Sequence, residues 1–407
     1  MKINAVKKVL FVSGSIGMGH VTRDLAIAKA LRKRNPDVEI SWLAYKPASQ
    51  VIKDAGENLL PESARYPDMT LVYEQTSKGL RISPLKALLK MAWADQVKHA
   101  YEVFQEVSSR ERFDLAIGDE TVEIVWMFRR NPRLRKLPFV YIDDLVRGGV
   151  PTKNPLWILV NYYMSRAFLS KKDLKSPPVQ WDMCLFVGQE EDIPDAKMGF
   201  MLPRTREWAR ACCKFIGYVF PFNPSEYADK SKVRASLGYG KEPLVICSIG
   251  GTAIGKELLL LCGRSYPIIK KKLPELRMIL VCGPRLSAES LDVPQGAEVR
   301  GYVPNLYQHF AASDLAIVQG GGTTTMELAA LRRPFLYFPL ENRFSDQQIQ
   351  VAVALKRHGA GINMTYSKTT PESLAEAIIS NIGKQVTYAP IPADGAQKAA
   401  QLIGQLL

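Results

Sequence analysis

The sequence of 407 residues has no apolar run long enough for a membrane-spanning helix, which needs about 18 consecutive apolar residues. It also has no signal peptide, because MKINAVKK is followed only by the short strand-like run VLFV. The six cysteines are scattered without C-x-x-C spacing, and several lie in apolar, strand-like runs. These absences predict a cytoplasmic protein whose cysteines are reduced core residues.

The first glycine-rich loop lacks the spacing of a dinucleotide-binding motif. Its glycines at 14, 17 and 19 form G-x-x-G-x-G instead of G-x-G-x-x-G. The next strand, expected over residues 38–44, also ends without the acidic residue that would bind a ribose. A nicotinamide or flavin cofactor is therefore not expected.

Two further motifs are incomplete. The stretch from Gly250 to Glu257 nearly matches a P-loop, but Glu257 stands where a hydroxyl would bind magnesium, which excludes a P-loop ATPase. A glycine-rich anion site remains open there. Asp143 and Asp144 are adjacent and do not form D-x-D, so the sequence predicts no metal site.

The net charge of +14 is the one unusual feature of the composition. There are 34 basic and 25 acidic residues before Phe215, and 20 and 15 from there onward, so both halves share the excess. A basic surface suits nucleic acid, anionic lipid or an anionic small substrate. Because no zinc-finger, RRM or KH signature is present, nucleic acid is not expected as a partner.

Apolar runs alternate with helical patterns along the whole chain, which predicts an α/β protein with buried parallel strands. The strands are expected at residues 6–13, 38–44, 113–117, 139–142, 181–187, 244–249, 278–282, 299–302, 315–318 and 335–339. The helices include residues 21–34, 82–107 (one long helix or a helix pair), 121–129, 155–169, 326–331 and 395–407.

The domain boundary is expected in the Gly-, Pro- and aromatic-rich stretch at residues 215–224. Residues 1–217 would form one domain and 218–390 a second, with a helix in 391–407 closing the fold. The last strand of the first domain would be residues 181–187. The apolar segment 155–169 is expected to be a core helix, with contact to a membrane surface or an apolar acceptor as the alternative.

Residues 311–361 form the most informative stretch. A buried strand ends at three glycines and three threonines (Gly320 to Thr325), and a helix follows. Backbone N–H groups at such a helix start can approach an anion closely, and the helix dipole favours negative charge there. Glu327 lies about one turn into the helix, where it could meet sugar hydroxyls. The alternative is a capping box between Thr324 and Glu327, which needs no ligand.

His20 is the side chain presented by the first glycine loop, at the carboxyl end of the first strand, where open α/β sheets place their chemistry. An imidazole there can act as a general base. Asp119 ends another strand of the same half and could hold the far nitrogen of that imidazole. The alternatives are a His20 that merely faces solvent and an Asp119 that caps the following helix.

The segment GYVPNLYQHFAASDLAIVQGGGTTTMELAALRRPFLYFPLENRFSDQ resembles the donor site of nucleotide-sugar glycosyltransferases of the GT-B fold. It is most similar to the branch that adds N-acetylglucosamine to the lipid intermediate of peptidoglycan, and natural-product glycosyltransferases share much of the pattern. The resemblance implies two Rossmann-like parallel-sheet domains facing across a cleft. It covers the second half well, but in the first half only the His20 loop, with Gly17 and Gly19, and loosely Asp119.

The resemblance implies a role for each matching residue. His20 would be the acceptor-side base and Asp119 its partner. The donor-binding residues would be Gly251 and Thr252 on phosphate; Tyr302 and Val303 along the base; Gly321, Gly322, Thr323 and Thr324 around the diphosphate; Glu327 on the ribose; and Asp346 and Gln347 facing the sugar.

The implied reaction is a metal-independent, inverting transfer of a sugar from a nucleotide sugar, with a UDP-sugar favoured, to a hydroxyl acceptor. A lipid-linked acceptor at the inner face of an anionic membrane is one option for that acceptor. No cofactor is expected. A sugar-nucleotide epimerase on the same fold and a non-catalytic nucleotide-sugar-binding subunit are the alternatives. The first loop, SGSIGMGHVTR, departs from the GGTGGH-like form of the lipid-intermediate enzyme, so its acceptor does not carry over.

Overall fold

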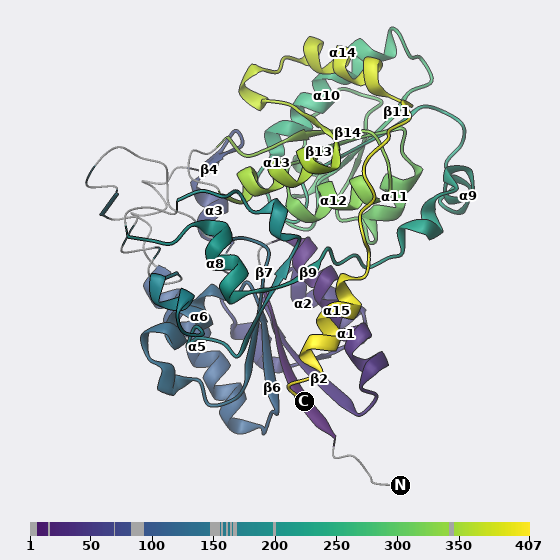
Figure 1. Cartoon of the computed structure of the whole chain (residues 1–407). Helices are drawn as coiled ribbons and strands as arrows, with labels where there is room; N and C mark the ends of the chain where they lie inside the picture. The colour runs from purple at the N-terminus through teal and green to yellow at the C-terminus, as the bar shows by residue number, and fades with distance from the viewer. Residues whose placement is uncertain are drawn as a thin grey trace. The chain divides into compact units, whose positions relative to one another are not determined.

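A computed structural model gives the architecture of the chain (Figure 1). It describes residues 6–14, 17–68, 70–82, 93–146, 155, 158–159, 162, 165, 169–197, 201–341 and 346–407. The chain forms two compact units. Unit 1 comprises residues 1–69, 88–221 and 392–407, and unit 2 comprises residues 70–87 and 222–391.

Unit 1 is built on a seven-stranded parallel sheet with the order β3-β2-β1-β6-β7-β8-β9. Its strands are β1 (Lys7–Ser13), β2 (Val38–Ala44), β3 (Asn58–Leu59), β6 (Leu115–Asp119), β7 (Phe139–Asp143), β8 (Met183–Val187) and β9 (Lys214–Gly217). The strand order reverses between β1 and β6, which makes that edge the topological switch point of the sheet.

Helices cover both faces of this sheet. They are α1 (Met18–Arg34), α2 (Ala48–Asp54), α5 (Trp93–Arg110), α6 (Val122–Arg130), α8 (Thr205–Cys212) and α15 (Gly395–Ile403), with short 3-10 helices at Pro61–Arg65, Pro132–Leu134, Lys171–Leu174 and Glu190–Asp192. The carboxy-terminal helix α15 packs against α1, so the end of the chain returns to unit 1 (Figure 1).

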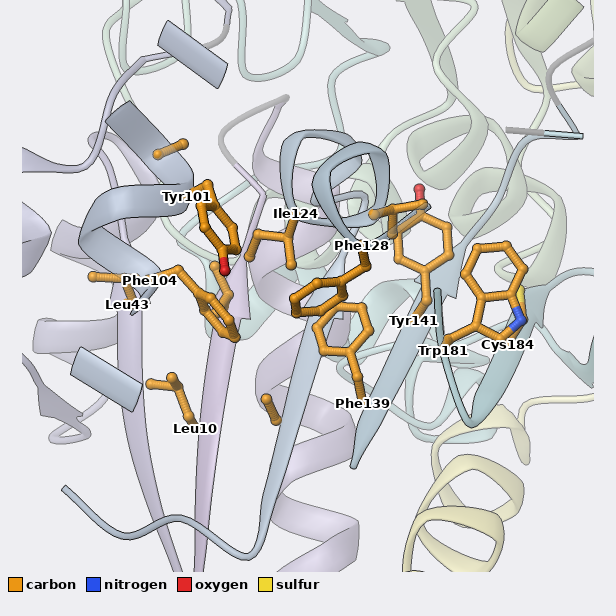
Figure 2. Close-up of a cluster of buried hydrophobic side chains, with 14 of the residues drawn as sticks. Leu10, Leu43, Tyr101, Phe104, Ile124, Phe128, Phe139, Tyr141, Trp181 and Cys184 are labelled. Carbon is orange, nitrogen blue, oxygen red and sulfur yellow. The ribbon is translucent and has the colours of Figure 1, made fainter. Parts of the chain in front are cut away.

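Successive residues of β1 point to opposite faces of the sheet, and each face has its own core. Val9 and Phe11 pack beneath α1 and α15. Leu10 lies in the other core, where Phe128 of α6 and Phe139 of β7 meet edge to face with ring centroids 5.4 Å apart. Figure 2 shows these aromatic side chains between the sheet and the helices above it. The sheet is thus buried on both faces, as its continuous apolar strands require.

Unit 2 repeats this plan with a six-stranded parallel sheet in the order β12-β11-β10-β13-β14-β15. Its strands are β10 (Leu244–Ser248), β11 (Arg277–Val281), β12 (Glu298–Arg300), β13 (Leu315–Gln319), β14 (Phe335–Phe338) and β15 (Ile362–Asn363). The switch point of this sheet lies between β10 and β13.

The helices of unit 2 are α3 (Leu71–Thr76), α9 (Lys230–Ser236), α10 (Lys256–Lys270), α11 (Leu306–Ala312), α12 (Gly322–Ala330), α13 (Asp346–His358) and α14 (Pro371–Asn381). Short 3-10 helices lie at Pro224–Tyr227, Ala288–Ser290 and Tyr366–Lys368. The helices α10 and α14 pack together over a core that includes Leu258 and Leu374. An antiparallel pair, β4 (Ser77–Lys78) and β5 (Arg81–Ile82), belongs to the same unit.

Several expectations need correction. Residues 181–187 do not hold the last strand of the first half, because β9 follows at the sheet edge. Ile82 lies in β5 and does not begin a long helix; α5 starts at Trp93. Residues 70–87 belong to unit 2, although the sequence places them within the first half. Most of the expected helix at 155–169 lies outside the described residues.

Two absences can be checked in the described part of the chain. None of its helices has the length and apolar character needed to cross a bilayer. All six cysteines are free thiols, and most are buried.

Candidate functional site

The switch point of unit 1 brings together the end of β1, whose glycine loop leads into the helix that carries His20, and the end of β6, which carries Asp119. Ser13 of β1 pairs with Asp119 of β6. Gly14 directly follows β1, and a Cβ atom at this position would lie 2.6 Å from the carbonyl oxygen of Asp119. Only glycine allows the two backbones to come this close.

His20 is part of α1, which begins after Gly17 and includes Gly19 in its first turn. The imidazole is buried, and its Nδ1 lies 3.3 Å from Oδ2 of Asp119. The structure therefore confirms that the side chains of His20 and Asp119 lie next to each other. The solvent-facing alternative for His20 is wrong, and so is the capping alternative for Asp119, because the residue before α6 is Thr121.

Arg23 is a further member of this cluster that sequence analysis did not find. It lies three residues after His20 on the same face of α1 and is 2% exposed. Its Nε donates to Oδ2 of Asp119 at 2.8 Å, and its Nη2 donates to the other oxygen of that carboxylate. Its Nη1 donates to Oδ2 of Asp144 at 2.6 Å. One buried guanidinium thus joins the ends of β6 and β7.

Burial and the neighbouring charges shift the pKa values of the carboxyl groups in this cluster. Burial opposes the charge of both carboxylates, but Arg23 overcomes this, placing the pKa of Asp119 well below its ordinary value and that of Asp144 at about 2. Asp24, which accepts a hydrogen bond from Ser13 at 2.6 Å, behaves differently. Burial and the neighbouring Asp119 raise the pKa of Asp24 well above its ordinary value.

The two partners of His20 require different tautomers. Nη2 of Arg23 lies 2.7 Å from Nδ1, and because a guanidinium only donates, that contact places the ring hydrogen on Nε2. The contact with Asp119 instead needs the hydrogen on Nδ1 and leaves Nε2 as an acceptor. Nε2 itself lies 3.8 Å from a carboxylate oxygen of Glu120.

One group of potential metal ligands occurs among the described residues. Atoms of His20, Glu120 and Asp144 lie within 4.8 Å of one another. However, Arg23 already donates to Asp144, so a divalent cation would have to sit beside a buried positive charge. The donor set therefore fits a metal poorly.

In unit 2 the glycine-threonine stretch forms the start of α12. Gly321 is the N-cap without a side-chain hydrogen bond, and the first intrahelical bond runs from Thr325 N–H to Gly321 O at 3.1 Å. Thr324 lies within the first turn and is not the cap, so the capping-box alternative is wrong. The N–H groups of Gly322, Thr323 and Thr324 precede the first intrahelical bond, and the helix dipole favours an anion beside them.

The loop of residues 249–255 leaves β10 on the other side of the same switch point. Gly250 has a φ of 79°, a conformation that favours glycine. The Gln319 side chain, with its amide nitrogen turned toward the loop, donates to the carbonyl oxygens of Ile249 (2.9 Å) and Ile254 (3.1 Å). Gly251 and Thr252 are thereby held next to the strand that leads into α12.

Glu327 lies in the second turn of α12 and is 8% exposed. Burial raises the pKa of its carboxyl to about 8, so the group is mostly protonated at neutral pH. A buried carboxyl whose pKa lies this far above its ordinary value is unusual for a purely structural residue and marks a candidate binding group.

This pKa predicts a pH-dependent stability. The contribution of the neutral Glu327 is fully present below the unfolded pKa of about 4.3 and is lost as the pH rises through the folded value of about 8. Relative to wild type, Glu327→Gln should therefore gain about 2 kcal/mol of unfolding free energy between pH 6 and pH 8. Urea unfolding at pH 6, 7 and 8 measures this, with Glu376→Gln on exposed α14 surface as the control. A difference between Glu327→Gln and wild type that is the same at every pH would contradict it.

The remaining expected donor residues are only partly placed. Tyr302 and Val303 follow β12, and Tyr302 is 42% exposed, which leaves its ring accessible. Asp346 and Gln347 begin α13, but their side chains lie outside what the structure describes. The neighbouring Gln348, which was not predicted, accepts a hydrogen bond from Leu340 N–H at 3.0 Å beyond the end of β14.

Comparisons with known proteins identify the family. The model of the glycosyltransferase family 28 C-terminal domain matches residues 245–405. An uncharacterized glycosyltransferase of Methanosarcina acetivorans is 32% identical over 391 residues, covering 92% of this chain and 87% of the relative. The chain belongs to the GT-B glycosyltransferases.

Other similarities agree with this family. The UDP-N-acetylglucosamine–N-acetylmuramyl-(pentapeptide) pyrophosphoryl-undecaprenol N-acetylglucosamine transferase of Symbiobacterium thermophilum is 24% identical, with 91% of this chain and 86% of the relative covered. The solved glycotransferase of kitacinnamycin shares the fold at a TM-score of 0.61 and 15% identity, covering 99% of both chains. The spinosyn rhamnosyltransferase complexed with thymidine diphosphate shares it at 0.56 and 17%, covering 98% and 95%.

The predicted fold class is therefore confirmed: each unit of this GT-B glycosyltransferase is a parallel-sheet α/β domain. The protein is an enzyme that uses a nucleotide sugar, which removes the non-catalytic subunit as an alternative.

Proposed function

We propose that this GT-B glycosyltransferase moves a sugar from a UDP-sugar to an acceptor hydroxyl, with inversion at the anomeric carbon and without a metal ion. The observation that carries the donor half is the start of α12, where the N–H groups of Gly322 to Thr324 precede a buried Glu327. A diphosphate at this helix start would be stabilised by the N–H groups and the helix dipole. The loop with Gly251 and Thr252 would provide the second side of this anion site.

The base and ribose of the donor would lie along the same edge of unit 2. The accessible ring of Tyr302 and the backbone of Val303 would contact the base, and Glu327 would accept hydrogen bonds from the ribose hydroxyls. Asp346 and Gln347 would face the sugar. Uridine as the base is favoured by the Symbiobacterium thermophilum relative, which is named for UDP-N-acetylglucosamine as its donor.

The acceptor hydroxyl would be deprotonated by Nε2 of His20. In this step the hydroxyl oxygen forms a bond to the anomeric carbon, the bond to the diphosphate breaks, and the proton passes to Nε2. This role requires the tautomer in which Nδ1–H donates to Asp119, 3.3 Å away, and not the one that the Arg23 contact favours, because only the former leaves Nε2 ready to accept. The same relative acts on a lipid-linked acceptor, and the net charge of +14 suits an acceptor that carries phosphate at an anionic membrane surface.

The ribose role of Glu327 gives a specific expectation for UDP binding. Because the carboxyl is mostly protonated at pH 7 and ribose hydroxyls donate best to a carboxylate, binding of UDP should release close to one proton. Calorimetry in two buffers of different ionisation enthalpy measures this release. Glu327→Gln should abolish the release and weaken UDP binding roughly 10- to 100-fold. A buffer-independent enthalpy together with unchanged affinity would count against the ribose role.

The reaction itself is tested by incubating the enzyme with a panel of nucleotide sugars and cell extract, followed by mass spectrometry of the products. The proposal expects a product that is heavier by one sugar and free UDP in equal amount. If NMR shows that the donor alone is converted to an isomer without any acceptor, the epimerase alternative replaces it.

A further inference from the structure

Residues 70–82, hereafter the strap, come from the amino-terminal half of the sequence but belong to unit 2. Leu80 is fully buried in the core of unit 2, together with Ile249 and Leu258. Its carbonyl oxygen accepts from Glu341 N–H at 2.8 Å, and the neighbouring Gly79 N–H donates to Glu257 at 3.1 Å. These contacts anchor the strap beside the start of α10.

The strap places a carboxylate on the glycine loop that follows β10. Oε1 of Glu74 accepts from the backbone N–H of Ala253 at 2.8 Å, and Oε2 lies 3.2 Å from Nη1 of Arg285. Both side chains are largely buried, with 12% of Glu74 and 13% of Arg285 exposed. Ala253 directly follows Gly251 and Thr252, the residues proposed above to contact the donor phosphate. An anion supplied by the chain itself therefore sits where an anion of the ligand is expected.

We infer that Glu74 is an internal competitor for the nucleoside diphosphate of the donor. Binding of the diphosphate displaces the carboxylate, and Ala253 N–H and Arg285 then bind a phosphate oxygen. A doubly charged diphosphate satisfies an arginine and a backbone N–H better than a single carboxylate does. This inference rests on the proposed function and adds Arg285 and Ala253 to the donor site.

The anchoring of the strap makes such a displacement feasible. Leu80 and its hydrogen bonds lie six positions beyond Glu74, so the Glu74 side chain can leave the loop while Leu80 stays in the core. Arg81 adds a second anchor through its Nη2, which lies 2.9 Å from Glu341. None of these contacts involves the Glu74 carboxylate.

Glu74→Gln tests the inference because it keeps an oxygen for Ala253 N–H but removes the charge that faces Arg285. We expect this variant to bind UDP and inorganic pyrophosphate roughly threefold to tenfold more tightly than wild type, and uridine equally well. Arg285→Met should weaken UDP binding, and in that background Glu74→Gln should bring little further gain. Calorimetry of the four proteins gives this double-mutant cycle.

Glu257→Gln is the matched control, because it removes the same charge from the first turn of α10 while keeping an oxygen for the Gly79 N–H that anchors the strap. Equal gains in UDP affinity in both variants would show that the loss of any nearby negative charge strengthens binding, and would overturn the inference. A Glu74→Gln variant that binds UDP no better than wild type would also overturn it. If wild type binds no UDP, the proposed function fails, and the pyrophosphate measurement then decides the inference by itself. A gain in pyrophosphate affinity that depends on Arg285 supports it, and no gain overturns it.

Discussion

Replacing His20 with alanine is expected to lower kcat by a factor on the order of 10² to 10⁴ while leaving the affinity for UDP nearly unchanged. The imidazole is buried in unit 1 next to Asp119, whereas the proposed nucleotide contacts all lie in unit 2. Loss of a proton acceptor raises the barrier of the chemical step without removing any contact with the nucleotide. Turnover is measured with the donor found in the mass-spectrometric screen, and UDP affinity by calorimetry.

The control for this experiment is His99→Ala, because His99 is an exposed histidine of α5 whose Nε2 lies 2.9 Å from the carbonyl oxygen of Arg65. It should keep wild-type turnover. If His20→Ala and His99→Ala turn over equally fast, His20 has no catalytic role. A loss of UDP affinity that accounts for the whole effect in His20→Ala would also contradict the assignment, since it would place the histidine in donor binding.

The strands of both sheets were predictable because their signal is local. Residues 38–44 form β2 with the expected bounds, and β1, β7 and β10 differ from the expectation by one residue at an end. A strand that is buried on both faces needs a continuous apolar run, and such a run is visible without knowledge of its neighbours. The strap was missed because its contacts are not local: Gly79 binds Glu257, which lies 178 positions away.

The same distinction separates the predicted from the missed site residues. Asp119 ends β6, and His20 lies in the first turn of the helix that follows the glycine loop after β1; glycines and polar residues mark both places in the sequence. Arg23 looks like an ordinary helix residue, since its partners Asp119 and Asp144 lie 96 and 121 positions further on. The only sign of its role in the sequence was that it lies three residues after His20, which places both side chains on the same face of a helix. The capping-box alternative was wrong because a glycine N-cap, Gly321, leaves no side-chain signal for the helix start.

Arg23→Met is expected to destabilise unit 1 by about 3–5 kcal/mol at pH 7. The substitution retains the volume of the side chain but leaves Asp119 and Asp144 buried without their cation. Because Arg23 lowers the pKa of both carboxyls, the stability it provides is present above their unfolded pKa of about 3.9 and is lost as the pH falls toward 2. The deficit of the variant should therefore be full at pH 7 and pH 5 and shrink below pH 4, which urea unfolding at these pH values measures.

Arg32→Met provides the comparison on the same helix. Arg32 also forms two hydrogen bonds to one carboxylate, that of Glu57, at 2.6 Å each, but its side chain is 37% exposed. Water can replace that pair, so its loss should cost at most about 1 kcal/mol. Adding Asp144→Asn to Arg23→Met should restore part of the lost stability, because one of the two uncompensated charges is then gone. Equal costs for Arg23→Met and Arg32→Met, with no recovery from Asp144→Asn, would mean that the buried guanidinium does not hold the ends of β6 and β7 together.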